Sequence, residues 1–104
     1  MGDMGVLLLC FDVPATTKKD AKTYRSIMKM LKDEGFIQLQ ESVYVKLLRH
    51  FAGRQREMDK LKAKLPAVGR IFILPLRLGD LKEICTISGT PFDVELFSDD
   101  IITF

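Results

Sequence analysis

Two hydrophobic patterns along the chain predict strands. Gly5–Val13 is a continuous apolar run, which is typical of a strand that is buried on both faces. Phe36–Leu48 alternates instead, with apolar residues at odd positions, and this predicts two half-buried strands joined by a turn near residues 40–42. Arg70–Leu76 is a third apolar segment, and its Pro75 favours a strand that lies at the edge of a sheet or is locally irregular.

The segments between these strands carry helical spacing. In residues 16–34 the apolar face consists of Ala21, Tyr24, Met28 and Leu31, with Ile27 alongside. We expect this helix to be capped by Thr16 or Thr17 and to end at Gly35 in a left-handed conformation. A second helix is predicted over residues 52–65, with inward side chains at Met58, Leu61 and Leu65.

The resulting order, strand-helix-strand-strand-helix-strand, predicts an α+β domain of ferredoxin-like type, with an antiparallel sheet and both helices on one face. We assign residues 1–89 to this domain and residues 90–104 to an acidic C-terminal extension. Lys82–Ile87 is a candidate short strand, and Val94–Phe97 or Ile101–Phe104 is a candidate last strand. The extension has no place in a single such unit, so we expect its strand to be exchanged in a homodimer.

Composition fits one packed domain in a reducing compartment. The chain has 104 residues, of which 47% are hydrophobic, enough for one core without disulfides. Cys10 and Cys85 each lie in an apolar segment and are read as small buried hydrophobes. There is no secretory leader pattern and no apolar run of membrane length, so we expect a cytoplasmic protein.

Charge is distributed unevenly along the chain. Residues 1–77 hold 15 Lys/Arg against 8 Asp/Glu, a net charge of +7, whereas residues 78–104 hold one Lys against six Asp/Glu, a net charge of −5. A basic body suits a polyanionic partner. The acidic tail suits docking on a basic protein surface, although simple solvation explains it equally well.

Asp12 is the first candidate for chemistry. It is the only charged residue between Met4 and Ala15, and it lies where the buried strand ends before Pro14. A carboxylate in this position can point out of the sheet toward a ligand, or it can be an ordinary loop or capping residue. Magnesium usually takes one or two carboxylates together with waters and phosphates, and a homodimer would supply a second copy of Asp12.

A basic stripe is the second candidate. Its members recur at spacings of four and three along the first predicted helix: Lys18, Lys22, Arg25, Lys29 and Lys32. This spacing places them on one face, where a phosphate backbone would neutralise them and release counterions. A solvated outer face is the alternative interpretation.

Two further features are weaker signals. Tyr44 has the polar parity of its strand, so it could stack on a base or sugar or fill a dimer or sheet-edge contact. In the second predicted helix, Glu57 and Asp59 interleave with lysines and arginines, which predicts a salt-bridged surface. We interpret His50 as a surface residue.

The sequence contains no glycine-rich phosphate loop, no nucleophile elbow and no clustered metal-ligand spacing. If the protein is an enzyme, metal-assisted phosphodiester hydrolysis is the reaction class that its residues favour.

Several short segments, in their order and spacing, resemble one known family. They are Phe11-Asp12-Val13-Pro14, Tyr24-Arg25, Gly35-Phe36-Ile37, Ser42-Val43-Tyr44 and Ile71-Phe72-Ile73-Leu74-Pro75-Leu76. Together they resemble the CRISPR-associated Cas-two (Cas2) family over about residues 5–89, and the overall pattern is nearest to members from type II systems. Phe11 departs from the family, which often has tyrosine before the aspartate.

The resemblance implies a homodimer of ferredoxin-like folds that acts with the Cas-one integrase in spacer acquisition, where the dimer holds the prespacer duplex. Some members of the family are metal-dependent endonucleases on RNA or double-stranded DNA. By this match Asp12 is the candidate magnesium ligand and catalytic residue. Arg25 and the lysines of the basic stripe are the candidates for binding nucleic acid.

Two alternatives remain open at the level of sequence. One is a free-standing metal-dependent ribonuclease of ferredoxin-like fold. The other is a generic ferredoxin-like module that binds RNA or regulates a partner, although the chain has no aromatic-rich RNA-binding signature.

Overall fold

The structure is a computed structural model that describes residues 3–92. Its elements, in chain order, are β1 (Gly5–Asp12), α1 (Lys18–Asp33), β2 (Ile37–Gln40), β3 (Val43–Leu48), a 3-10 turn (Phe51–Gly53), α2 (Arg54–Lys64), β4 (Arg70–Arg77) and α3 (Leu78–Leu81). The candidate last strand, Val94–Phe97 or Ile101–Phe104, lies outside the described residues, as does most of the predicted extension.

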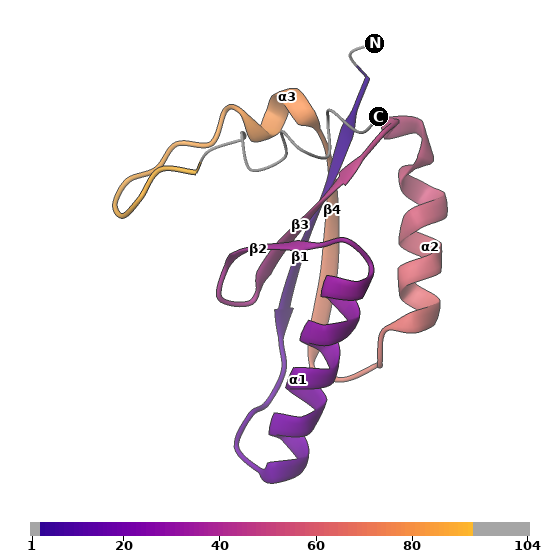
Figure 1. Cartoon of the computed structure of the whole chain (residues 1–104), viewed down its shortest axis with the longest axis vertical. Coiled ribbons are helices and arrows are strands. Elements are labelled where there is room, and N and C mark those ends of the chain that lie inside the picture. The colour runs from indigo at the N-terminus through magenta and orange to yellow at the C-terminus, as the bar shows by residue number, and fades with distance from the viewer. Residues whose placement is uncertain (1–2, 93–104) are drawn as a thin grey trace.

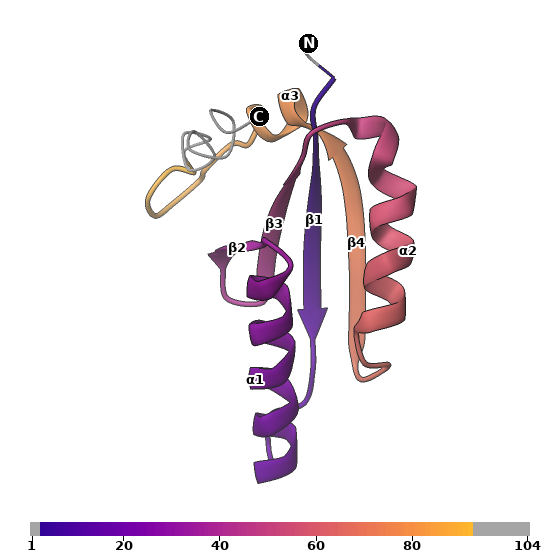
Figure 2. The ribbon, with the colours of Figure 1, turned by 45° about the vertical axis from the view of Figure 1, so that its right-hand side comes forward.

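Within the described residues the strands form one antiparallel sheet in the order β2-β3-β1-β4. The helices α1 and α2 lie on one side of this sheet, while α3 lies on the other side at one end (Figures 1 and 2). This arrangement confirms the predicted ferredoxin-like α+β fold. Within the described sheet β4 is an edge strand, a position in which proline is tolerated, and Pro75 lies opposite Leu7 of β1.

The sequence signals for α1 match its observed ends. The side-chain oxygen of Thr17 accepts a hydrogen bond from the backbone N–H of Asp20 at 3.0 Å, which satisfies one of the free donors of the first turn. At the other end Gly35 has a φ of 91°, a left-handed conformation that glycine adopts without steric cost. The predicted second helix is also present, with its first turn in 3-10 form before α2.

The central strand β1 is fully buried on the face toward the helices, whereas on its other face Val6 is buried and Leu8 and Cys10 are only half-buried. The continuous apolar run predicted burial on both faces. Leu7, Leu9 and Phe11 face the helices, in a core that includes Ile27 and Leu31 of α1 and Leu61 of α2. Val6 belongs to a second, smaller core with Val45, Leu47 and Leu81 on the opposite side of the sheet. The short helix α3 therefore covers one end of the face that α1 and α2 leave open.

The predicted strand over Lys82–Ile87 is wrong. These residues form turns and irregular backbone that leads away from the sheet (Figure 1). The backbone N–H groups of Glu83 and Ile84 donate to the carbonyls of Asp80 and Leu81, so they extend the last turn of α3 instead of pairing with a strand. Its apolar side chains Ile84 and Ile87 are 44% and 96% exposed.

An ion-pair cluster joins α2 to the C-terminal end of α1. The carboxylate of Glu34 lies 2.8 Å from Nζ of Lys64 and 3.2 Å from Nζ of Lys60, and its side chain is only 14% exposed. The hydrogen bond from Lys64 lowers the pKa of Glu34 below its ordinary value, against the opposing effect of burial. Glu34 therefore stabilises the packing of the two helices while it is ionised.

We predict that Glu34→Gln lowers the free energy of unfolding at pH 7 by about 1 kcal/mol, the upper end for partly exposed pairs. Because the folded-state pKa of Glu34 is lowered, its contribution is complete above the unfolded carboxyl pKa of about 4.3 and is lost as the pH falls further. Urea unfolding of both proteins between pH 7 and pH 3 measures this. Glu83→Gln is the control, because Glu83 makes no ion pair within residues 3–92. A difference between wild type and Glu34→Gln that does not change with pH would contradict the assignment.

Candidate metal and nucleic-acid site

Asp12 is the last residue of β1, and its side chain is exposed. Its cross-strand partner on β4 is Arg70, the first residue of that strand. Side chains alternate along a strand, so Asp12 lies on the same sheet face as Cys10 and Leu8, opposite to the face that α1 and α2 cover. Within residues 3–92 its carboxylate makes no hydrogen bond or ion pair, which leaves its oxygens available to a ligand.

The residue before Asp12 anchors the strand end firmly. The backbone N–H of Phe11 donates to the carbonyl of Ser42 at 3.1 Å, which ties β1 to the turn between β2 and β3. Its ring packs against Tyr24, with centroids 5.3 Å apart, and against Tyr44 at 5.8 Å. Asp12 therefore projects from a strand end whose preceding side chain is fixed in the core.

The donor set for a metal is one carboxylate per chain. No group of three or more His, Cys, Asp or Glu side chains in the described part of the chain lies close enough to hold a metal ion. One carboxylate fits magnesium, which completes its octahedral shell with waters and substrate phosphates. It does not fit a dedicated metal cage built from one copy of the chain.

The basic stripe forms as predicted. Its members, Lys18, Lys22, Arg25, Lys29 and Lys32, are all exposed, whereas Ile27 and Leu31 of α1 are buried on the other face of the helix. Lys29 pairs with Asp33 at 2.9 Å. For the other four members the described residues show no carboxylate partner, so their charge is available to a polyanion.

The cations of α2 behave differently. Lys60 and Lys64 are held by Glu34, and Glu57 pairs with Lys46 of β3 and, at 3.8 Å, with Lys60. This confirms the prediction of a salt-bridged surface. Arg56 and Lys62 of α2 make no ion pair within residues 3–92, so unbalanced positive charge remains on both helices and is arranged as a continuous stripe on α1.

The structure corrects the prediction for Tyr44. This side chain is 5% exposed and belongs to the core beneath α1, because the even positions of β3 face the helices. Burial raises the pKa of its hydroxyl. The ring has no open face on which a base could stack, so we leave Tyr44 out of the nucleic-acid surface. The alternation of β3 was ambiguous because apolar residues cover both faces of that strand.

Sequence reasoning missed the uncovered apolar part of the sheet. Phe72 and Leu74 of β4 are 53% and 50% exposed, and their cross-strand neighbours on β1 are Cys10 and Leu8. These four residues, which we call the open face, lie next to Asp12 on the same side of the sheet. The sequence did contain a signal for the open face. A half-buried strand needs apolar residues on one face only, and Ile71 and Ile73 provide them, so Phe72 and Leu74 indicate a second apolar face.

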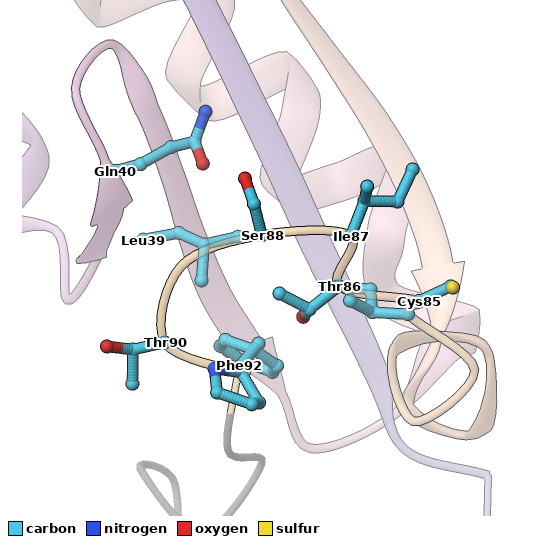
Figure 3. Close-up of a pocket in the computed structure, with 10 residues that line it drawn as sticks. Leu39, Gln40, Cys85, Thr86, Ile87, Ser88, Thr90 and Phe92 are labelled. Carbon is cyan, nitrogen blue, oxygen red and sulfur yellow. The ribbon is translucent and has the colours of Figure 1, made fainter.

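A cavity of about 650 Å³ lies away from Asp12, between β2 and the segment after α3. Figure 3 shows Leu39 and Gln40 of β2 on one side and Ile87, Ser88, Thr90 and Phe92 on the other. Among residues 3–92, its lining contains no carboxylate, histidine, lysine or arginine. These lining residues therefore offer a phosphate no cationic partner and a metal ion no carboxylate.

The helices of the described region are too short and too polar to cross a membrane. The fold and the site together define a class: small ferredoxin-like domains with a bare carboxylate at the end of the first strand and a basic first helix. Residues 4–84 match the profile of the family described as CRISPR associated protein Cas2. The chain belongs to the Cas2 family.

Individual relatives agree with this assignment. The chain is 40% identical over 68 residues to the CRISPR-associated endoribonuclease Cas2 of Streptococcus mutans serotype c (strain NN2025), a match that covers 65% of this chain and 64% of that protein. It is 28% identical over 85 residues to the protein of the same name from Acidovorax ebreus (strain TPSY), with 82% and 83% covered. The match to Streptococcus mutans Cas2 thus spans slightly less than two thirds of that relative.

Proposed function

We propose that this Cas2 protein acts as a homodimer in CRISPR spacer acquisition, where it binds nucleic acid and bridges the Cas-one integrase. We further propose that its two Asp12 carboxylates together support magnesium-dependent hydrolysis of phosphodiester bonds. One observation carries the proposal: an exposed carboxylate without a partner in residues 3–92 lies at the end of β1, on the side of the sheet that bears the open face.

The open face supports the homodimer. Half-exposed Phe72 and Leu74 are costly to leave in water, and their burial would contribute roughly 25 cal/mol for each Å² covered. The open face of a second copy can cover it, because in a two-fold interface the same patch of both protomers is in contact. Since Asp12 borders this face, such a cover would bring two copies of Asp12 toward one site. The predicted exchange of the C-terminal strand is part of the same proposal.

In the proposed chemistry the metal ion and each set of side chains have separate roles. Magnesium, when bound, activates a water molecule and offsets charge on the phosphate oxygens. Asp12 of each chain would hold the ion through a carboxylate oxygen. Arg70, its cross-strand partner on the same face, would contact a phosphate oxygen of the substrate. The exposed stripe on α1 would bind the phosphate backbone without reading its sequence.

A second candidate function is cleavage independent of the integrase, by a free-standing metal-dependent ribonuclease. The name endoribonuclease, which the matched relatives carry, favours it. Both functions use Asp12 and the basic stripe, and they differ in their partner. Co-purification with the Cas-one integrase expressed together with this chain separates them, since only the first function requires a stable complex.

We predict that Asp12→Asn lowers magnesium-dependent cleavage of RNA or duplex DNA by on the order of 100-fold or more, because it removes the anionic ligand while keeping the side-chain shape. Cleavage of labelled substrates with and without magnesium measures the loss. Glu41→Gln is the matched control, since Glu41 is an exposed carboxylate in the β2–β3 turn. Equal activity of Asp12→Asn and wild type would remove the catalytic part of the proposal and leave the binding part standing.

We predict that replacing Lys22 and Arg25 by glutamine weakens nucleic-acid binding at all sequences. The slope of log affinity against log salt should fall by about 1 for each phosphate contact that is lost. Titrations at several salt concentrations measure this slope. Lys62→Gln on α2 is the control, because Lys62 is equally exposed and makes no ion pair within residues 3–92. An unchanged slope in the double variant would exclude the stripe from the interface.

We predict that Phe72→Ser shifts the protein from dimer to monomer, as removing a large apolar group from an interface centre commonly costs 2 kcal/mol or more, or roughly 30-fold in affinity. Sedimentation equilibrium over a range of concentrations measures the constant. Ile87→Ser is the control, because Ile87 is 96% exposed but lies outside the open face. If Ile87→Ser dissociates the dimer and Phe72→Ser does not, the interface lies elsewhere.

A further inference from the structure

Gly69 lies immediately before β4, where the chain approaches the end of β1. Its φ is +58°, in the left-handed region. A Cβ atom placed on Gly69 would lie 2.2 Å from the backbone oxygen of Asp12 and 3.0 Å from Cα of Val13. These are contacts between backbones, so no change of side-chain rotamer could relieve them.

The close approach fixes the last pairing of the sheet. Directly after Gly69, Arg70 pairs with Asp12, and this is the final pair of the β1–β4 ladder. Any side chain at position 69 must push the strand end away by about 1 Å to reach an ordinary contact distance. The atoms that this side chain would contact belong to the backbone of Asp12 and Val13. The displacement would therefore move the backbone that carries the candidate metal ligand.

We propose that Gly69 is a positioning residue for Asp12: its lack of a side chain lets β4 approach closely enough to set where the Asp12 carboxylate stands. This inference rests on the proposed function, in which Asp12 acts in metal-dependent cleavage. Nothing in the motif around Asp12 reveals the role, because residue 69 is far away in sequence and makes its contact only in the fold.

Other glycines of the chain provide matched controls. Gly35 also has a positive φ, of +91°, but a Cβ there would meet only the flexible end of the Lys46 side chain at 3.8 Å. Gly35→Ala therefore imposes backbone strain without moving Asp12. Gly53 has no atom within 4 Å of its Cβ position, so Gly53→Ala tests substitution alone.

The first measurement is structural and needs no activity. In wild type, the α-protons of Gly69 and Val13 should show a nuclear Overhauser contact, and its absence would overturn the inference even if no variant folds. In ¹⁵N–¹H spectra, Gly69→Ala should shift the amides of Asp12 and Val13, while Gly35→Ala leaves them in place. Gly69→Asn should shift them as much as alanine does, because asparagine tolerates a left-handed φ but keeps its Cβ. If the Asp12 and Val13 amides of Gly69→Asn had the same chemical shifts as in wild type, backbone strain at residue 69 would explain the alanine result. The contact of the Cβ atom would then not matter, and the proposal would be overturned.

The second measurement is kinetic, at a temperature where all variants are folded. Gly69→Ala and Gly69→Asn should lower kcat by about 100-fold, the loss that a displacement of about 1 Å can cause. KM for nucleic acid should change much less than kcat, because the stripe on α1 is untouched and the neighbouring Arg70 is one phosphate contact among several. Gly35→Ala should keep both constants. Wild-type kcat in the Gly69 variants would overturn the positioning role.

The cleavage assays distinguish a failure of this inference from a failure of the proposed function. If wild type shows no magnesium-dependent cleavage, the catalytic proposal fails, and the role of Gly69 in catalysis falls with it. If wild type and Gly35→Ala cleave and the Gly69 variants cleave equally well, Asp12 keeps its proposed role and only the inference about Gly69 is wrong.

Discussion

The central place of β1 in the sheet is the constraint on which the rest of the structure depends. Hydrogen bonds to β3 and β4 fix this strand along both edges, and apolar side chains cover its helix-facing side and, around Val6, the start of its other side. Backbone polar groups buried in this way must be paired, so the register of both neighbouring strands follows from β1. The turn to α1, the start of β4 and the anchoring of Phe11 are all defined relative to this one strand. Asp12 is the point where the strand meets solvent.

Much of the fold could be predicted because its signals are local. The continuous apolar run before Pro14, the cap at Thr17 and the glycine at position 35 each determine structure through neighbouring residues alone. The predicted strand over Lys82–Ile87 failed for the opposite reason. Its composition is suitable, but pairing depends on whether the chain runs alongside a strand, and after α3 it leads away from the sheet, which is not a property of the segment itself.

The candidate site likewise combines features that local sequence predicts with features that depend on the fold. Asp12 and the stripe on α1 are visible in the sequence, because a lone charge in an apolar run and a repeat of cations are both local patterns. The burial of Tyr44 was not visible, since β3 carries apolar residues on both parities. The open face and the contact between Gly69 and Asp12 join segments about sixty residues apart, so they emerge only from the register of β1 with β4.

Electrostatics gives the two long helices different roles. On α2, Glu34 and Glu57 hold Lys60 and Lys64, and these pairs bind the helices to each other and to β3. On α1, most of the stripe has no such partner within the described chain. One set of cations thus contributes to cohesion, and the stripe is left for an external anion. A polyanion that binds along α1 need not break any of the ion pairs on α2.

The position of Asp12 at the end of β1 also has a consequence for motion. Proteins open locally in units, and the last unit to open is the one with the most buried and most fully paired backbone. In this chain that unit is β1 with its two neighbours. Fraying of residues 82–92, which follow α3, would leave the paired end of β1 unchanged. We therefore expect the Asp12 carboxylate to be attached to the part of the fold whose backbone amides exchange most slowly, and its position should persist through fluctuations that rearrange much of the surrounding surface.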